Sequence, residues 1–409
     1  MVSVEEAEHI ISAEIKDYGT ELIHFESAHG RVLAEDLRAD RDLPPCNRAT
    51  MDGIAISYSA FEKGIRSFQI IATIAAGDAP LEMENKNECV EIMTGAPLPD
   101  AADTVIRYED VEIKSSTALI RIDIVKKRQN IHRKGKDKQA GEVVAVANQF
   151  ITPALISMAA SIGKTTLLVK KLPKVVIVTT GNELVGVDIE PTAYQVRQSN
   201  NYTIKAVLQQ YGLNADLLHI GDDPKETKEK IKKVLEEYDV AILTGGVSMG
   251  KFDYVPKALD ELGVSKLFHK VQQRPGKPFW FGKDMGGSLV FAFPGNPVSA
   301  FMCLHRYFVP WLETSLTSGT RISNSQFPVA KVYAVLDDEV TFTAPLKYFV
   351  QVKTEINERG CLLAIPREGN GSGDFANLPD TDAFMELPLE QSIFRKGEVY
   401  RIWPYKKIV

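Results

Sequence analysis

The sequence has few cysteines, and neither its cysteines nor its histidines form a recognisable metal site. Four cysteines lie far apart in 409 residues, with no C-x-x-C pair. Neither a structural zinc site nor a disulfide framework is therefore expected, and a reducing cytoplasm fits this composition. The seven histidines form no H-E-x-x-H or H-x-H group. We expect them to lie at the surface or in packing positions rather than to bind a metal.

The sequence also lacks an excess of basic residues and a long apolar run. A net charge of −6 argues against a general nucleic-acid binder. No apolar stretch reaches membrane-spanning length, and the first residues, MVSVEEAEHIISAEI, are acidic, unlike a signal peptide. A hydrophobic content of 44% and a charged content of 25% are typical of globular proteins. The length predicts about two to four domains.

The amino-terminal half contains helical patterns on either side of a β-rich region. Residues 3–18 carry apolar side chains at helical spacing, and FESAHGRVLAEDL (25–37) is also helix-like. Short β-rich runs separated by Gly and Pro fill residues 54–128. The segment ITPALISMAASIG then predicts a helix that begins at Pro153.

Residues 173–315 show the alternation typical of an α/β layer domain. The runs KVVIVTT, ADLLHI and VAIL predict strands, with helices over YTIKAVLQQYG and KETKEKIKKVLEEY between them. Asp223 and Pro224 are placed to cap and begin the second of these helices. Two further strands follow, SKLFHKV and SLVFAF. The remaining residues return to a β pattern that suggests a small barrel or sandwich.

Carboxylates follow three of these strands, at the ends where parallel sheets bind their ligands. Glu183 follows the first strand, Asp222 and Asp223 follow the second, and Asp253 follows the third. Such a group would form an oxygen-rich site for Mg²⁺. Helix capping alone would explain one of the two neighbouring aspartates, and Asp253 could equally cap the helix after it.

A glycine-rich turn in the same domain indicates an anion site. The turn TGGVSMGKFDY (244–254) fits most of the phosphate-loop pattern G-x-x-x-x-G-K-[ST], but Phe252 replaces the hydroxyl that would reach Mg²⁺. This departure argues against a nucleoside triphosphatase. The backbone amides at Gly245 and Gly246, together with Ser248, still suit an anion.

The segments RPGKP and PGNPVS supply positive charge and a helix start. Arg274 can bind a phosphate bidentately, and Lys277 can act as a point charge. Asn296 and Ser299 stand at a helix start, where free N–H groups attract anions. Simple turns are the alternative for each Pro-Gly pair, but two pairs in one domain favour an anion site.

Two proline-rich loops and a basic stretch stand apart from these elements. PPCNRATMDG (44–53) and MTGAPLPD (93–100) do not resemble core strands, and KKRQNIHRKGKDK (126–138) has seven basic residues. Rigid turns and a solvated loop are the simplest interpretations. Binding residues are nevertheless common in loops of this kind.

Nine segments, taken together, resemble the molybdopterin molybdenumtransferase family, the MoeA and gephyrin E-domain group. In sequence order they are SVEEA, GRVLAEDL, DLPPCNRATMDG, IMTGAPLPDAADTVI, QNIHRKGKD, TTGNEL, TGGVSMGKFDY, RPGKP and FPGNPVS. The resemblance implies insertion of molybdate into adenylylated molybdopterin, with Mg²⁺ and release of AMP. It also implies contact with the molybdopterin adenylyltransferase, whereas neither nucleic acid nor a membrane is an expected partner.

The resemblance implies a multidomain α/β plus β fold with an elongated shape. Family members are homodimers whose active cleft lies between the α/β domain of one subunit and the β insertion of the other. The expected domains are a discontinuous N-terminal elongated domain (1–43 and 129–172), a β insertion (44–128), a three-layer α/β molybdopterin-binding domain (173–318) and a small C-terminal β-barrel (319–409).

Matching the motifs residue by residue implies a role for individual side chains. Asp52 and Thr94 match the contribution of the partner subunit, and Asp52 is the expected acid/base or positioning residue. The expected catalytic residues are Asp52, Glu183, Asp222, Asp253 and Lys277, of which Glu183, Asp222 and Asp253 would bind the metal. The expected substrate-binding residues are Thr94, Arg133, Asp137, Ser199, Gly245, Gly246, Ser248, Arg274, Pro294, Asn296, Pro297 and Ser299.

Several positions depart from the family pattern. Asn182 replaces the acidic residue of TGDE, and Gln198 stands where a small polar residue is common. PLKYFVQV lacks the pattern G-R-x-x-F-x-R, which makes Lys347 a candidate replacement for the missing arginine. An arginine-to-lysine change at a bidentate anion site alters affinity. These departures leave open an alternative, a pterin-binding or scaffold protein of the same fold that has lost turnover.

Overall fold

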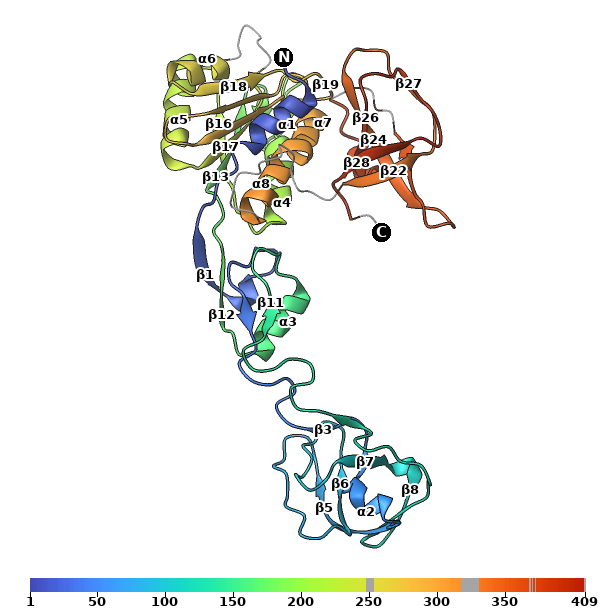
Figure 1. Cartoon of the computed structure of the whole chain (residues 1–409). Coiled ribbons are helices and arrows are strands. Elements are labelled where there is room, and N and C mark those ends of the chain that lie inside the picture. Colours follow the sequence, from blue (N-terminus) through green and yellow to red (C-terminus); the bar gives the residue numbers. More distant parts are fainter. Residues whose placement is uncertain (248–253, 318–330, 368, 370, 372, 408–409) are drawn as a thin grey trace.

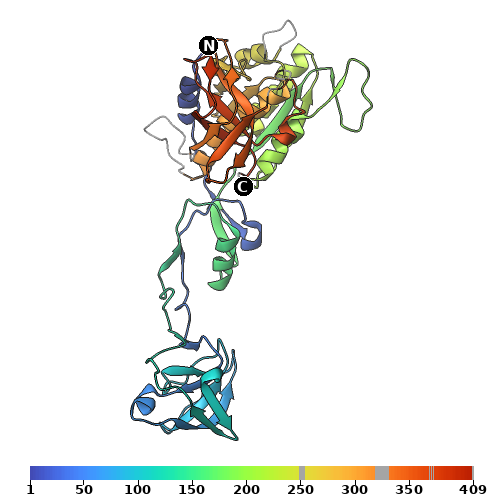
Figure 2. The ribbon, with the colours of Figure 1, turned by 90° about the vertical axis from the view of Figure 1, so that its right-hand side faces the viewer.

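The chain is elongated, with its mass divided between two ends. The computed structural model describes residues 1–247, 254–317, 331–367, 369, 371 and 373–407. An α/β unit and a C-terminal β unit lie next to each other at one end, and a β insertion lies at the other (Figure 1). A slender connecting unit joins the two ends, as the view turned by 90° about the vertical axis also shows (Figure 2).

A mostly parallel sheet forms the centre of the α/β unit. Its strands, in spatial order, are β16 (Asp216–Ile220), β13 (Val175–Thr180), β17 (Val240–Thr244), β21 (Leu289–Phe293), β20 (Trp280–Lys283) and β18 (Ser265–His269). The first four strands run parallel, and the last two are antiparallel to their neighbours. β13, β17 and β21 are buried along their whole length, as strands covered on both faces must be.

Helices cover both faces of this sheet and complete the expected three layers. One core contains α1 (Val4–Ser12), α4 (Asn200–Gln209), α7 (Pro297–Cys303), the π-helical turn η3 (Leu304–Phe308) and α8 (Val309–Thr317). The other core contains α5 (Pro224–Glu237) and α6 (Tyr254–Glu261). None of the helices in the described residues is both long and apolar enough to cross a membrane.

Helix α1 packs on the α/β unit, which corrects the expectation that residues 1–43 belong wholly to the elongated domain. Val4, Ala7 and Ile11 are buried in the same core as Val175. The helical spacing of these apolar residues predicts the helix and its buried face. The spacing does not indicate which hydrophobic core the buried face of α1 joins. The other expected domain boundaries stay predictions.

The connecting unit is an antiparallel ribbon followed by a small helical layer. β1 (Thr20–His24) pairs with β12 (Thr166–Lys170), and His24 lies opposite Thr166 at the far end of the ribbon. β2 (Leu37–Arg38) pairs with β11 (Val143–Ala145), beside α3 (Pro153–Ser161). α3 begins at the predicted Pro153.

The helix expected over residues 25–37 does not form. Only a short 3-10 turn, η1 (Phe25–Ser27), is present there. Gly30 follows with a φ of +78°, which ends any helical path, and Leu33 then bridges Val169 as extended chain. Leu33 and Leu37 fill the connecting core from an extended backbone instead, and Val32 packs into the core of the α/β unit.

The β insertion is a mixed sheet, as its β-rich sequence predicts. Its strands, in spatial order, are β7 (Thr104–Arg107), β4 (Gly53–Ile56), β6 (Glu88–Ile92), β5 (Ser67–Ile74), β9 (Thr117–Ile120) and β8 (Val111–Lys114). α2 (Tyr58–Glu62) and the 3-10 turn η2 (Tyr108–Asp110) accompany them. β3 (Arg48–Ala49) pairs with β10 (Ile131–His132) where the chain enters and leaves the insertion.

The C-terminal unit is a closed barrel with one additional strand. β24 (Lys347–Ile356), β25 (Leu362–Pro366), β22 (Val332–Leu336), β28 (Val399–Pro404) and β26 (Ala383–Leu387) are neighbours in this order, and β26 pairs with β24 to close the ring. β23 (Val340–Thr341) pairs with β27 (Ile393–Phe394), and the 3-10 turn η4 (Leu378–Asp380) precedes β26. The additional strand, β19 (Gln273–Arg274), comes from the α/β segment of the chain and pairs in parallel with β24.

The β4–β7 pairing generates a prediction about Gly53. A Cβ atom at this position would lie 1.8 Å from the carbonyl oxygen of Ile106, a backbone atom that cannot rotate away. Gly53→Ala should therefore lower the free energy of unfolding of the β insertion by ~3 kcal/mol, measured by calorimetry. Ser67→Ala, an exposed change in β5 of the same sheet, is the control. An unchanged melting transition in Gly53→Ala would contradict the close approach.

Candidate active site

A cleft of about 740 Å³ opens at the carboxyl ends of β13 and β17. Its walls are the ends of these strands, the loop from β14 (Leu184–Val185) to β15 (Val196–Arg197), and the starts of α4 and α7. Gly373 and Phe375 add a wall from the C-terminal unit. The predicted residues that line this cleft are Glu183, Ser199, Gly245, Asn296 and Pro297.

The glycine turn after β17 is shaped for a polar ligand group. Gly245 and Gly246 have φ values of +91° and +66°, which favour glycine. A Cβ on Gly246 would lie 2.7 Å from Oγ1 of Thr180. This hydroxyl is buried and has no hydrogen-bond partner among the described residues. Buried hydroxyls without a partner are uncommon, so this one marks the glycine turn as a candidate binding feature.

Glu183 is the acidic side chain of the cleft. No other Asp or Glu lines it among the described residues. The Glu183 carboxylate folds over the backbone of Gly181, where a Cβ would meet its Oε2 at 2.2 Å. Gly181 has a φ of +128°, so this position also favours glycine and leaves room for the carboxylate.

The other predicted carboxylates do not join Glu183 in the described structure. Asp222 accepts a hydrogen bond from the Asn182 N–H at 3.0 Å, and its own N–H donates to Asn182 Oδ1 at 3.1 Å. This exchange ties together the loops after β13 and β16. Asp223 caps α5 by accepting from the Glu226 N–H at 2.7 Å, so of the two neighbouring aspartates it is the one that serves as the cap.

A carboxylate cluster for Mg²⁺ is not assembled by the described residues alone. In the part of the chain that the structure describes, no group of three or more His, Cys, Asp or Glu side chains could hold a metal ion. Asp253, the third expected metal ligand, and Ser248 lie outside the described residues. Glu183 is thus the carboxylate on which a metal proposal rests.

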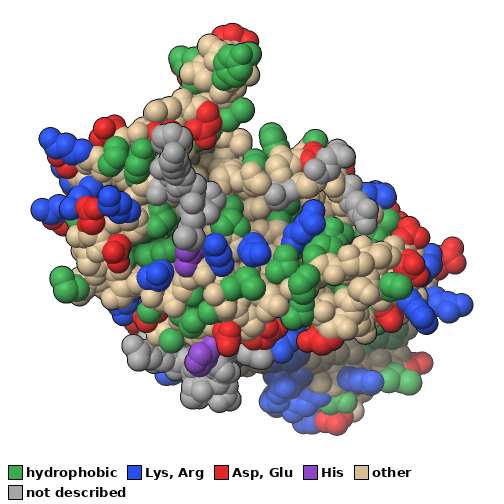
Figure 3. Space-filling model, turned by 90° about the horizontal axis from the view of Figure 1, so that it is seen from above, with side chains coloured by type: hydrophobic (Ala, Val, Ile, Leu, Met, Phe, Trp, Pro, Cys, Tyr) green, Lys and Arg blue, Asp and Glu red, His purple; other side chains and the backbone are tan. Residues whose placement is uncertain are grey.

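A smaller hollow of about 60 Å³ adjoins the cleft and contains two arginines. Arg274 comes from β19, and Arg367 and Gln351 come from the C-terminal barrel. The hollow and the cleft are lined by neighbouring residues of the chain, Val298 next to Pro297 and Gly371 near Gly373. Sequence reasoning missed two residues of the hollow: Arg367 belongs to no motif, and Gln351 lies in PLKYFVQV (345–352), where only Lys347 was singled out. Basic side chains also form a row across the middle of the face seen from above (Figure 3).

Two predicted basic residues differ from expectation in their placement. Lys277 is exposed on the turn after β19 and lines neither the cleft nor the hollow. Lys347 does not replace a missing anion-binding arginine, because its amino group contacts Glu5 and lies 2.9 Å from Glu386. The prediction for Lys347 is therefore wrong.

The segment just before α7 accepts a hydrogen bond from a side chain of another helix. Asn296 occupies the cap position before Pro297, but its side chain makes no capping hydrogen bond. Asn200 of α4 instead donates from Nδ2 to the Gly295 carbonyl at 2.7 Å. Asn200 is a cleft residue that the sequence analysis did not single out. Neither Pro294 nor the buried Ser299 lines the cleft.

The remaining predicted residues lie together at the β insertion. Asp52 Oδ1 accepts from the Thr94 N–H at 2.6 Å and from its hydroxyl at 2.7 Å. These two bonds, the backbone bond first, lower the pKa of Asp52 below its ordinary value. The two proline-rich loops pair through Ala49, whose N–H donates to Ala96 at 3.0 Å.

The basic stretch reaches the same place but not the cleft. β10 pairs with β3, and Asp137 lies 2.8 Å from His132 Nε2 while Arg133 is exposed. In one chain this group lies at the opposite end from the cleft (Figure 1). A single chain therefore does not bring Asp52 and Thr94 to Glu183.

The comparisons with known proteins cover the whole chain. Three family profiles match in order: the MoeA N-terminal region (domain I and II) at residues 2–163, a probable molybdopterin binding domain at 176–314, and the MoeA C-terminal region (domain IV) at 333–405. A solved molybdopterin biosynthesis protein from Pyrococcus horikoshii is 27% identical, with a TM-score of 0.80 over 100% of both chains.

Two curated relatives share the name molybdopterin molybdenumtransferase. A molybdopterin molybdenumtransferase from Synechocystis is 36% identical over 99% of this chain and 100% of the relative. One from Staphylococcus epidermidis is 30% identical over 97% and 94%. The fold and the cleft thus define a molybdenum cofactor biosynthesis protein. The chain belongs to the molybdopterin molybdenumtransferase family, and the scaffold alternative is not favoured.

The bonds to Asp52 generate a prediction about its ionisation. Thr94→Val removes the hydroxyl donor and keeps the backbone donor, so the pKa of Asp52 should rise part of the way to its ordinary value. Carboxyl-carbon NMR over an acidic pH series measures this shift. Thr73→Val, which removes a bond to Glu91 in the same unit, should leave it unchanged. An unchanged pKa in Thr94→Val would refute the assigned cause.

Proposed function

We propose that this chain inserts molybdate into adenylylated molybdopterin, with hydrolysis of the adenylate and release of AMP. The main support for the proposal is that two candidate binding sites lie next to each other. The cleft at the strand ends, which Glu183 and several uncharged polar side chains line, adjoins a hollow lined by Arg274 and Arg367. One site suits a phosphorylated pterin, and the other suits a small oxyanion.

The cleft supplies several groups for a phosphate. Gly245 keeps a side chain out of the cleft, although its N–H donates to the Phe293 carbonyl at 3.3 Å, and the unpaired Thr180 hydroxyl lies against the same turn. The start of α4, at Ser199 and Asn200, lies in the same wall, where free N–H groups favour an anion. These groups would orient the substrate, and orientation alone can contribute much of a rate enhancement.

The hollow supplies the positive charge that molybdate requires. Molybdate is a dianion that must approach an already anionic substrate, so repulsion has to be neutralised. Arg274 and Arg367 would do this from two sides, and Gln351 adds an uncharged hydrogen-bonding group. Lys277, exposed on the same turn as Arg274, would strengthen the field outside the hollow.

Mg²⁺ belongs to the proposal, and the cleft fits it in part. Mg²⁺ usually keeps several waters and binds through one or two carboxylates together with substrate phosphate. Glu183 would be one such carboxylate, and Asp253 the expected second. Asp222 would support their position through Asn182 rather than bind the metal. Bound there, the ion would neutralise phosphate charge.

The proposal includes a homodimer whose cleft is completed by the partner. Asp52 and Thr94 belong to the β insertion, which lies at the opposite end of the chain from the α/β unit that contains Glu183 (Figure 1), so they would reach the cleft of a second copy. A lowered pKa keeps Asp52 ionised at neutral pH, so it would begin the reaction as a base or as a positioning group. Arg133 and Asp137 would arrive with the same unit.

The supply of substrate is part of the same proposal. The adenylylated pterin would come from a molybdopterin adenylyltransferase in contact with this protein. A reducing cytoplasm is the proposed location, in keeping with the free cysteines Cys46, Cys89, Cys303 and Cys361.

The first test is release of AMP from adenylyl-molybdopterin and Mg²⁺, with and without molybdate. The wild-type protein should release AMP in a molybdate-dependent manner, and Glu183→Ala should reduce kcat at least about 100-fold with the fold intact. Glu229→Ala, an exposed change on α5, is the matched control. Tight pterin binding by the wild type without any AMP would reject the transferase.

Mixed dimers test whether the cleft is shared. Asp52→Asn and Glu183→Ala, each inactive alone, should recover about one quarter of wild-type activity when co-expressed, because roughly half of the dimers then have one complete cleft. A pair of variants on the same side of the cleft, Glu183→Ala and Arg274→Ala, should recover nothing. No recovery in the first pair would mean that Asp52 does not act across the dimer.

A further inference from the structure

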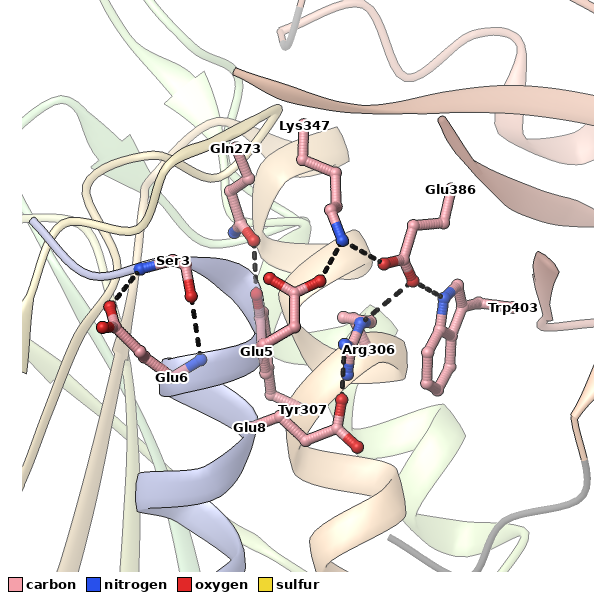
Figure 4. A network of polar contacts seen from close by, with 10 residues as sticks. All are labelled: Ser3, Glu5, Glu6, Glu8, Gln273, Arg306, Tyr307, Lys347, Glu386 and Trp403. Atoms are coloured by element: carbon pink, nitrogen blue, oxygen red, sulfur yellow. Dashed lines mark hydrogen bonds and ion pairs between the residues drawn. The ribbon is translucent and has the colours of Figure 1, made fainter. Parts of the chain in front are cut away.

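The anion hollow is built on a junction of only two residues. β19 pairs in parallel with β24, with Gln273 opposite Lys347 and Arg274 opposite Tyr348. Arg274 and Tyr348 both line the hollow, whereas Gln273 and Lys347 are held by a network of buried polar contacts (Figure 4). The position of Arg274 relative to the barrel thus depends on the contacts that hold Gln273 and Lys347.

On the α/β side, Gln273 holds the turn that follows Arg274. Its side chain is 0% exposed; Nε2 donates to the Gly276 carbonyl at 3.1 Å, and Oε1 accepts from the hydroxyl of Tyr307. Gly276 has a φ of +86°, and a Cβ there would lie 2.7 Å from Cys303 Sγ. The turn is therefore seated tightly on the helix that contains Tyr307.

On the barrel side, Lys347 is held by a chain of charges. Its amino group lies 2.9 Å from Glu386, which also accepts from the Trp403 indole at 2.8 Å. Arg306 lies 3.6 Å from the same carboxylate. Arg306, 2% exposed, also donates to Glu8 of α1 at 2.6 Å.

Both chains of contacts end on consecutive residues of one helical turn. Arg306 and Tyr307 lie in η3, and the Arg306 guanidinium sits 5.0 Å from the Tyr307 ring centroid. η3 is π-helical, an arrangement often found at functional sites. The wall of the hollow that contains Arg274 is thus connected to Tyr307 through Gln273. The wall formed by the barrel is connected to Arg306 through Glu386 and Lys347.

We infer that Arg306 and Tyr307 are positioning residues for the oxyanion, setting the separation of Arg274 from Arg367 and Gln351. The inference rests on the proposed function. Neither residue lines the hollow, so both act through others, Tyr307 through Gln273 and Arg306 through Glu386 and Lys347. A bidentate arginine site is sensitive to small shifts, because a displacement of about 1 Å can cost about 100-fold.

A solely structural role makes a different prediction. Loss of a buried hydroxyl would then lower the melting temperature without a specific change in affinity for the oxyanion. Tyr211 offers a control, because its hydroxyl donates to half-buried Glu313 at 2.9 Å in the same unit, away from the hollow. Tyr211→Phe and Tyr307→Phe each remove one hydroxyl that donates to a side chain of the α/β unit, from a half-buried ring and from a fully buried ring respectively.

The test combines calorimetric titration with sodium molybdate and AMP-release kinetics on the full-length protein. Tyr307→Phe should raise both the Kd and the KM for molybdate about tenfold, with kcat changed less than about twofold. Lys347→Gln should do the same, and Lys347→Arg should restore most of the affinity. Tyr211→Phe should leave Kd and KM unchanged, whatever its melting temperature.

The outcomes separate this inference from the proposed function. Unchanged molybdate affinity in Tyr307→Phe and Lys347→Gln, or an equal loss in Tyr211→Phe, would overturn the positioning role. Molybdate binding without AMP release in the wild type would reject the transferase, while the affinities would still test the positioning. A wild type that binds no molybdate would overturn both.

Discussion

The junction between the α/β unit and the barrel depends on neutralising one buried cation, the guanidinium of Arg306. Glu8, near the start of the chain, and Glu386, near its end, supply the negative charge. A buried cation without partners would cost several kcal/mol. Burial raises the pKa of Glu386, but the charges of Arg306 and Lys347 outweigh this and lower it to about 2. Glu386 therefore remains charged at physiological pH and continues to neutralise Arg306 and Lys347.

Most of the α/β unit could be predicted because its signals are local. Strand runs without polar interruption, a cap and proline at Asp223 and Pro224, and the glycines at 245 and 246 each act within a few residues. Parallel strands then place Glu183 and Gly245 at one edge. The same reasoning failed at residues 25–37, where a helix-like pattern packs from extended chain because Gly30 and the pairing of Leu33 override it.

The parts of the site that escaped prediction depend on contacts between distant segments. Arg367 and Gln351 reach the hollow only because the barrel seats against β19, and no local pattern marks them. Lys347 looks like an anion ligand in sequence, but alternation along β24 turns it to the side opposite Tyr348, toward Glu386. Asn182, which appears to be a lost acid, holds Asp222 instead.

The ribbon of β1 and β12 has a topological consequence. Because Thr20 lies opposite Lys170 and His24 lies opposite Thr166, the chain leaves the α/β unit and returns to it along one two-stranded ribbon. None of the strands of the α/β sheet or the barrel lies between these residues, although Val32 and Phe150 pack against the core of the α/β unit. Changes in the length of the two segments that join the β2–β11 pair to the β3–β10 pair would alter how far the insertion reaches, because these segments lie beyond the contacts of Val32 and Phe150 with the α/β core.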